Sequence, residues 1–107
     1  MVGSVEDEPY CEIDLWGVMQ DFSGFRFVGR DLATRAARVS SRIVSWDGRE
    51  RTATTVSGRF YRLVGEPNPR VTRNLVRAHI NKWRLRPDDA VVVNPEEIVD
   101  LLGEILR

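Results

Sequence analysis

The chain has 107 residues, of which 42% are hydrophobic and 30% charged, a balance typical of one globular domain and a length too short for two. Its single cysteine, Cys11, excludes an internal disulfide framework and favours a reducing compartment. No apolar run approaches the roughly 18 residues of a membrane span, and the acidic first residues are unlike a signal peptide. We therefore expect a cytoplasmic protein with no membrane partner.

The formal net charge of zero conceals three regions of different sign. Residues 1–24 hold six acids and no base, residues 25–86 hold fifteen bases and four acids, and residues 87–107 hold six acids and one base. Such segregation presents a basic middle to an anionic partner and leaves acidic ends for another surface. Fifteen of the sixteen bases are arginine, which reflects either the codons of a GC-rich genome or bidentate grip on carboxylates and phosphates.

The first part of the chain predicts a leader followed by strands. Residues 1–10 are acidic and polar and predict a flexible leader, so the single folded domain is expected at 11–107. Residues 11–19 fit a strand or the start of a helix, and Ile13, Leu15 and the Gly17 break favour the strand. A turn at 21–24 and a strand at 25–28 are predicted to follow. Residues 31–39 are ambiguous, because Asp31 is placed to cap a helix of barely two turns.

The middle of the chain predicts a meander of three antiparallel strands. Residues 41–46 are rich in β-formers and are followed by Asp47-Gly48, a strong hairpin signal. Residues 49–56 form the predicted partner strand. Ser57-Gly58 then predicts a second tight turn before a third strand at 59–64.

Two helices are predicted near the C-terminus. Asn68-Pro69 and Asn94-Pro95 each place an N-cap Asn before a proline at the first helical position. In the first helix, over residues 69–85, an apolar face includes His79 and Trp83. A short β-branched run at 90–93 adds a strand between the helices. The fold class is therefore α+β: an antiparallel meander of about four to six strands in a curled or barrel-like sheet, with two C-terminal α-helices.

No motif indicates an active site. His79 is the only histidine, and its position on an apolar helix face favours a core or boundary residue over a ligand. Cys11 has neither a second cysteine nor a nearby histidine, so no zinc site or Cys–His pair is indicated. There is no glycine-rich phosphate loop and no set of acids with metal-ligand spacing. We expect a non-enzymatic protein without a cofactor or metal.

Two arginine clusters are candidate partner-binding surfaces. At 100° per residue, four arginines of the first helix fall within a sector of about 60° and form a stripe about 20 Å long. This stripe suits a phosphate backbone or an acidic groove; alternatively, the acidic face of the last helix neutralises it. The second cluster interleaves with aromatic residues of the meander, which either stack bases or fill the core. The stripe is Arg70, Arg73, Arg77 and Arg84, and the second cluster is Arg49, Arg51, Arg59 and Arg62, with Arg42 beside them.

The meander carries one recognisable string. The run from Thr55 to Pro67 follows the pattern T-x-S-G-x-x-Y-x-L-x-G-x-P, which resembles hairpins of small bacterial and phage-borne proteins of uncharacterised function. The resemblance implies turn and strand chemistry and provides no catalytic residue. Because such proteins occur on mobile elements, it also implies a host-directed inhibitor of the anti-CRISPR kind, by analogy alone.

The leading hypothesis is a binding protein that blocks a nucleoprotein or nuclease complex stoichiometrically. Its acidic ends, including Asp14 and Asp21, are expected to imitate phosphates toward the basic surface of that complex. The alternative hypothesis is direct nucleic-acid binding through the arginine stripe of the helix at 69–85. A structural subunit of a larger assembly is a third possibility, and the sequence leaves the oligomeric state open.

Overall fold

The computed structural model describes residues 9–96, which fold into seven strands and one helix. The elements are β1 (Tyr10–Asp21), β2 (Gly24–Asp31), β3 (Ala37–Val39), β4 (Ile43–Asp47), β5 (Thr52–Thr55), β6 (Phe60–Leu63), α1 (Pro69–Lys82) and β7 (Ala90–Val93). The fold class is therefore α+β, as the sequence predicts. The second predicted helix lies outside the described residues from position 97 onward, and so do positions 1–8 of the predicted leader, whereas Tyr10 already belongs to β1.

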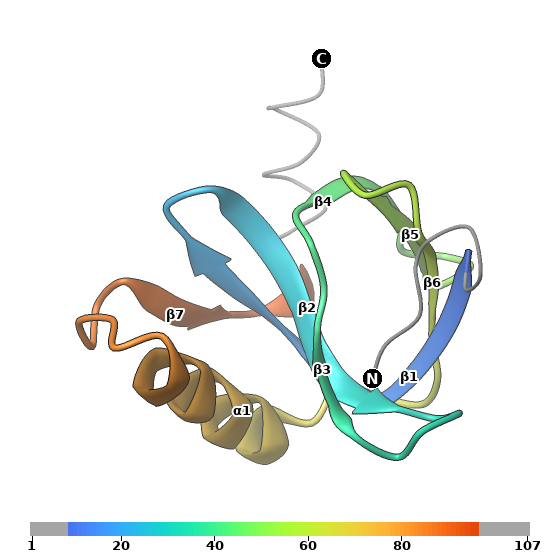
Figure 1. Ribbon diagram of the computed structural model, residues 1–107. Coiled ribbons are helices and arrows are strands. Elements are labelled where there is room, and N and C mark those ends of the chain that lie inside the picture. The colour runs from blue at the N-terminus through green and yellow to red at the C-terminus, as the bar shows by residue number, and fades with distance from the viewer. Residues whose placement is uncertain (1–8, 97–107) are drawn as a thin grey trace.

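One curled sheet contains all seven strands, in the order β3-β2-β1-β6-β5-β4 with β7 also paired to β1 (Figure 1). The predicted meander is confirmed, because β4 pairs with β5 and β5 with β6 in antiparallel register. Of the two expected shapes, curled or barrel-like, the sheet is curled and does not close, because β3 and β4 do not pair. Two expectations were wrong: the sheet has more strands than four to six, and it is not wholly antiparallel, because β1 pairs with β6 in parallel.

Strand β1 joins the two halves of the sheet because it bends in its middle. Its first half, Tyr10–Ile13, pairs with β6, and its last residues, Val18–Asp21, pair with β7, while β2 runs along the opposite edge. The β1–β2 register shifts between Asp14 and Gly17, and Leu15 there has a φ of 48°. An irregularity of this kind bends a strand and increases its twist.

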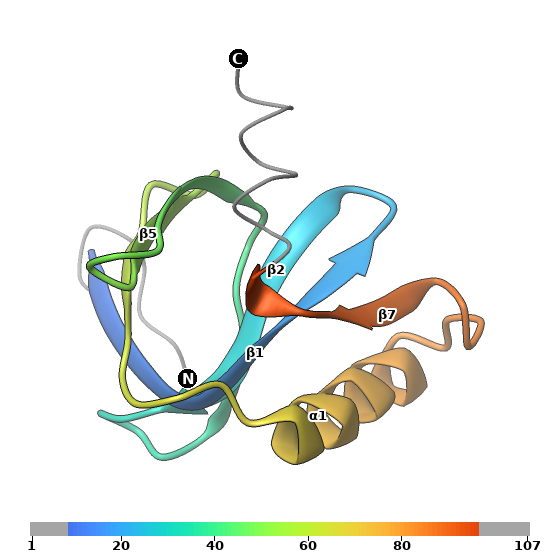
Figure 2. The same ribbon diagram turned by 180° about the vertical axis from the view of Figure 1, so that it is seen from behind.

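The bend divides the apolar side chains between two cores. Inside the curl, Val18 and Phe27 belong to a large cluster that also contains Trp16 of β1 and Tyr61 with other residues of the meander. On the opposite face of the same strands, Met19 and Val28 pack with Val76 of α1, which covers the outer side of the sheet (Figure 2). Because alternate residues point to opposite faces, β1 and β2 are buried on both sides where α1 lies against them.

The helix is held close to the sheet at Gly17. A Cβ atom at this position would lie 1.9 Å from Oγ1 of Thr72 and 2.7 Å from its Cβ. Thr72 is itself buried, and its hydroxyl donates to the Asn68 carbonyl at 2.6 Å. Only glycine permits this close approach of helix and strand.

The limits of α1 follow from its caps. The side chain of Asn68 accepts a hydrogen bond from the Val71 N–H at 3.0 Å, and Pro69 occupies the first turn, as predicted. The helix ends at Lys82, with Trp83 as the C-cap, and Arg84 has a φ of 52°. The predicted helix over 69–85 was therefore three residues too long. No helix within positions 9–96 has the length and apolarity needed to cross a membrane.

The ambiguous segment 31–39 is a turn followed by a strand. The carboxylate of Asp31 accepts hydrogen bonds from the N–H groups of Ala33 at 2.8 Å and Thr34 at 3.2 Å. Side-chain bonds of this kind occur at turns as well as at helix starts. Here the chain reverses through Arg35, with a φ of 62°, and continues as β3, which pairs with β2.

Candidate anion-binding surface

The solvent face of α1 is basic and contains no acid. The helix sequence PRVTRNLVRAHINK includes three arginines and one lysine but neither Asp nor Glu. Arg70, Arg73, Arg77 and Lys82 are all exposed, whereas Thr72 and Val76 on the opposite side are buried against the sheet. We call these four cations the basic helix surface. The expected stripe is present for its first three arginines, but Arg84 lies beyond the helix and leaves it.

The arginines of this surface have no carboxylate partner within positions 9–96. The ion pairs of this part of the chain do not involve α1. They are Arg30–Asp14, Arg26–Asp21, Arg38–Asp31 and Arg51–Glu66. These positions hold fifteen basic and ten acidic residues, a formal excess of five positive charges. Unlike the paired arginines, those of α1 present their guanidinium groups to solvent.

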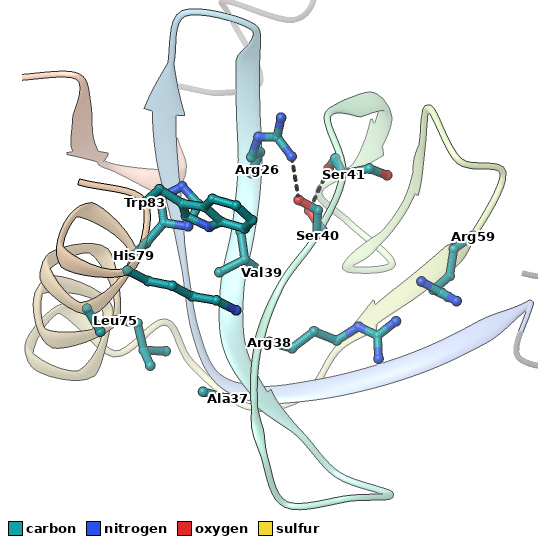
Figure 3. A pocket seen from close by; sticks show the side chains of 12 residues that line it. Arg26, Ala37, Arg38, Val39, Ser40, Ser41, Arg59, Leu75, His79 and Trp83 are labelled. Carbon is teal, nitrogen blue, oxygen red and sulfur yellow. Dashed lines mark hydrogen bonds between the residues drawn. The ribbon is translucent and has the colours of Figure 1, made fainter. Parts of the chain in front are cut away.

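A groove of about 550 Å³ lies beside the basic helix surface, between α1 and β3. On the sheet side it is lined by Arg26 and by residues of β3 and the segment that follows, and on the helix side by Leu75, Ala78, His79, Lys82 and Trp83 (Figure 3). Arg59 completes its far side. No Asp or Glu is among the described residues that line it. Strand β3 ends the sheet, so its outer backbone edge borders the groove without a strand partner among the described residues.

Arg26 is fixed in the groove wall by three acceptors. Its Nε donates to Asp21 Oδ2 at 2.8 Å, and its two terminal nitrogens donate to the Ser40 carbonyl and the Ser23 hydroxyl, each at 3.1 Å. Burial alone would raise the pKa of Asp21, but hydrogen bonds from Ser23 and the charge of Arg26 lower it. Arg26 is thus a rigid part of the wall whose charge Asp21 already offsets.

Behind the groove wall, Arg38 belongs to a buried polar network. Arg38 donates to Asp31 Oδ2 at 2.8 Å and to the Tyr61 hydroxyl at 3.1 Å, and both members of the ion pair are buried. Burial would raise the pKa of Asp31, but the N–H groups of Ala33 and Thr34 and the Arg38 guanidinium lower it. The Cys11 thiol donates to the same carboxylate at 3.6 Å, and burial raises its pKa to about 11. The network is structural, because each of its charges is matched.

The helix side of the groove carries the groups that are open to solvent. Trp83 is 61% exposed, although the sequence placed it on the apolar face, and the ammonium of Lys82 lies 5.4 Å from its ring centroid. His79 lies half-buried at the boundary, as predicted, and burial together with the nearby charge of Arg26 lowers its pKa. The imidazole is therefore mostly neutral near pH 7.

The second predicted cluster is dispersed. Arg49 lies in the β4–β5 turn and Arg62 on β6, and Figure 1 shows these strands at the other end of the curled sheet from α1. Arg51 donates to the Gly65 carbonyl at 2.5 Å and pairs with Glu66 at 2.9 Å, while Arg59 lines the groove.

The aromatic residues of this cluster divide between the core and the surface. Tyr61 is buried in the core, and Trp46 packs against it in the same cluster, which favours the core alternative for these two. Phe60 is exposed instead and stacks on Tyr10 with ring centroids 5.8 Å apart. The aromatics therefore do not form one base-stacking face.

The two acids named as phosphate mimics are both ion-paired within the sheet. Asp14 accepts two hydrogen bonds from Arg30, at 2.9 and 2.6 Å, and these bonds lower the pKa of its carboxyl group. Asp21 holds Arg26 as described above. The three acids of the N-terminal leader and three of the six acids at 87–107 lie outside the described residues, whereas Glu12, Asp88, Asp89 and Glu96 lie within them.

Sequence reasoning missed the groove and two of its residues, Lys82 and Arg26. The signal for Lys82 was present, since a lone lysine next to a tryptophan at the end of a basic helix is a recognisable cation–aromatic pair. Arg26 is held by Asp21 and Ser23 of the adjacent turn and by the Ser40 carbonyl, and only the contact with Ser40, far along the chain, has no local signal.

In three comparisons with known proteins, no family model, no curated protein and no solved structure matches the chain. Within positions 9–96 there is no group of three or more His, Cys, Asp or Glu residues arranged to hold a metal ion. The candidate site therefore depends on its own geometry, which is a basic helix face beside a groove that lacks acids.

Proposed function

We propose that this protein binds nucleic acid directly and without catalysis, through the basic helix surface of α1. The observation that carries the proposal is the exposure of Arg70, Arg73 and Arg77 without a carboxylate partner within positions 9–96. From Arg70 to Arg77 the helix rises about 10 Å, which matches about three phosphates at roughly 3.4 Å of axis per phosphate on one strand. A row of guanidinium forks at this spacing suits a phosphate backbone better than isolated carboxylates.

This proposal has more support than stoichiometric blockade of a nucleoprotein complex by acidic ends. Blockade needs carboxylates that are available to a partner, and both Asp14 and Asp21 are ion-paired within the sheet. The blockade hypothesis, its anti-CRISPR analogy and the cytoplasmic location stay predictions from the sequence.

The test is fluorescence anisotropy of labelled single-stranded and duplex oligonucleotides over a salt series from about 50 to 200 mM. The variant Arg70→Gln/Arg73→Gln/Arg77→Gln removes three contacts, so the slope of log K against log salt should become shallower by about 2 for a single strand and by about 3 for a duplex. Where the variant and the wild type bind equally at about 1 M salt, a slope difference of about 2 corresponds to a roughly 100-fold weaker affinity of the variant for a single strand at about 100 mM salt.

A matched control removes the same charge elsewhere. Arg35, Arg49 and Arg62 are exposed and lie away from α1, so Arg35→Gln/Arg49→Gln/Arg62→Gln should keep a near wild-type slope. Equal losses in both variants would show attraction by net charge alone and would contradict a site on α1. Absence of binding by the wild-type protein at the lowest salt would end the proposal.

A further inference from the structure

The groove beside α1 combines an exposed aromatic ring, cations and an absence of acids, which the basic helix surface alone does not explain. Trp83 is the C-cap residue of α1, and 61% of its surface is exposed to solvent. Tryptophan is the largest apolar residue type and is mostly buried in folded proteins. Figure 3 shows its indole extending from the end of the helix toward Arg26 and Val39 across the groove. A large ring held in this way offers a flat apolar surface to a ligand.

We infer that the groove binds the bases of single-stranded nucleic acid, with one base stacked on Trp83. The inference rests on the proposed function, because it names which form of nucleic acid the basic helix surface holds. The bases of a duplex already stack on each other inside the helix, whereas a single strand exposes its base faces, and aromatic rings beside cations are the usual means of holding them.

Charge in and around the groove suits this ligand. Arg26 and Arg38 are matched by Asp21 and Asp31, so they shape the walls without adding net charge. Lys82 has no ion pair within the described residues, and its ammonium lies over one face of the Trp83 ring, 5.4 Å from the centroid, so the base is expected on the other face of the indole. Its ammonium is therefore placed to neutralise the phosphate that follows a stacked base.

The groove also connects with the arginines of α1. At 100° per residue, the exposed face runs from Arg73 and Arg77 through Asn74 and Ala78 to Lys82, and Ala78 and Lys82 line the groove. Phosphates on the arginines and a base on Trp83 are thus compatible with one continuous strand. The groove volume of about 550 Å³ lies within the range of about 300–1,000 Å³ that pockets for small ligands occupy.

The test compares a short oligothymidylate of about ten nucleotides, within the usual site size, with an abasic oligonucleotide of the same length. Trp83→Ala should weaken oligothymidylate binding between about 5-fold and 150-fold, the range for loss of one stacked base, and leave the salt slope unchanged. Trp83→Phe should retain most of the affinity. Binding of the abasic strand should not change, since it has no base to stack.

The matched control is Phe22→Ala, which truncates another exposed aromatic residue, 94% exposed in the β1–β2 turn, and should leave binding as in the wild type. Quenching of tryptophan fluorescence gives a direct signal, because Trp16 is buried, Trp46 is partly buried against the core and Trp83 is 61% exposed. We expect quenching by oligothymidylate in the wild type and little in Trp83→Phe.

The outcomes separate the two proposals. If Trp83→Ala binds oligothymidylate like the wild type while the α1 triple variant loses binding, the base-stacking inference is wrong and the proposed function stands. An equal loss for the abasic strand would likewise overturn stacking. If the wild type binds neither single-stranded probe, the base-stacking inference fails, and the proposed function fails with it only if the wild type also does not bind duplex.

Discussion

Replacing Gly17 by alanine should displace α1 and thereby test the packing on which the candidate surface depends. The added Cβ would lie 1.9 Å from Oγ1, 2.5 Å from Cγ2 and 2.7 Å from Cβ of Thr72. A rotamer change of Thr72 can move the first two atoms, but the third is fixed by the helix backbone. The helix must therefore shift away from β1 by several tenths of an ångström or more.

The expected cost follows from these contacts. Overpacking a well-filled core costs about 1–3 kcal/mol, whereas removing glycine from a strand interior returns roughly 0.5–1 kcal/mol. Because the closest contact is far inside van der Waals distance, we expect Gly17→Ala to lower the free energy of unfolding by about 2 kcal/mol. For a domain of this size the melting temperature should fall by about 10 °C. Urea denaturation followed by circular dichroism measures the change.

Second-site variants identify the cause. In Gly17→Ala/Thr72→Ala two of the three clashing atoms are absent, and in Gly17→Ala/Thr72→Gly all three are, at a helix cost of about 1 kcal/mol for glycine. Each double variant should be more stable than the sum of its single changes predicts, by about 1 kcal/mol. A Gly17→Ala protein within 0.5 kcal/mol of the wild type (about the error of additivity), or strictly additive double variants, would refute close packing of α1 on β1.

Three further predictions concern the buried network and the helix cap. Asp31→Asn leaves Arg38 buried without its counter-charge and should lower the free energy of unfolding by about 3–5 kcal/mol, measured by urea denaturation. The fold lowers the pKa of Asp31, so its contribution to the free energy of unfolding should be fully present above the unfolded pKa of about 3.9 and lost as the pH falls through the folded pKa. Thermal melts from pH 7 to pH 2 should therefore show a decline in stability below about pH 4. This decline should be smaller in Asp31→Asn. Burial raises the pKa of Cys11 to about 11, so the native thiol should react with a disulfide reagent at pH 8 at least tenfold more slowly than in urea, and equal rates would contradict its burial. Asn68→Ala removes the bond to the Val71 N–H and should cost about 1 kcal/mol, whereas Asn68→Ser should retain most of the stability.

The sequence predicted the parts of this protein whose physics is local. The cap at Asn68 and the proline after it indicate where α1 begins, because both act within one turn of helix. The hairpin signals at 47–48 and 57–58 indicate the meander for the same reason. The 100° spacing also placed Arg70, Arg73 and Arg77 together on the exposed face of α1.

Tertiary structure alone decided the rest, because it depends on contacts between residues far apart in the chain. The parallel pairing of Tyr10 with Phe60 cannot be read from either strand, since both edges of β1 were open to several partners. The register of β1 and β2 brings Asp14 to Arg30, which pairs within the sheet a carboxylate that the sequence offered to a partner. The groove lies between α1 and β3, and the close approach of α1 to β1 at Gly17 is likewise a contact between distant parts of the chain. Local patterns specify which elements form, whereas burial, register and close approach determine which charges remain exposed.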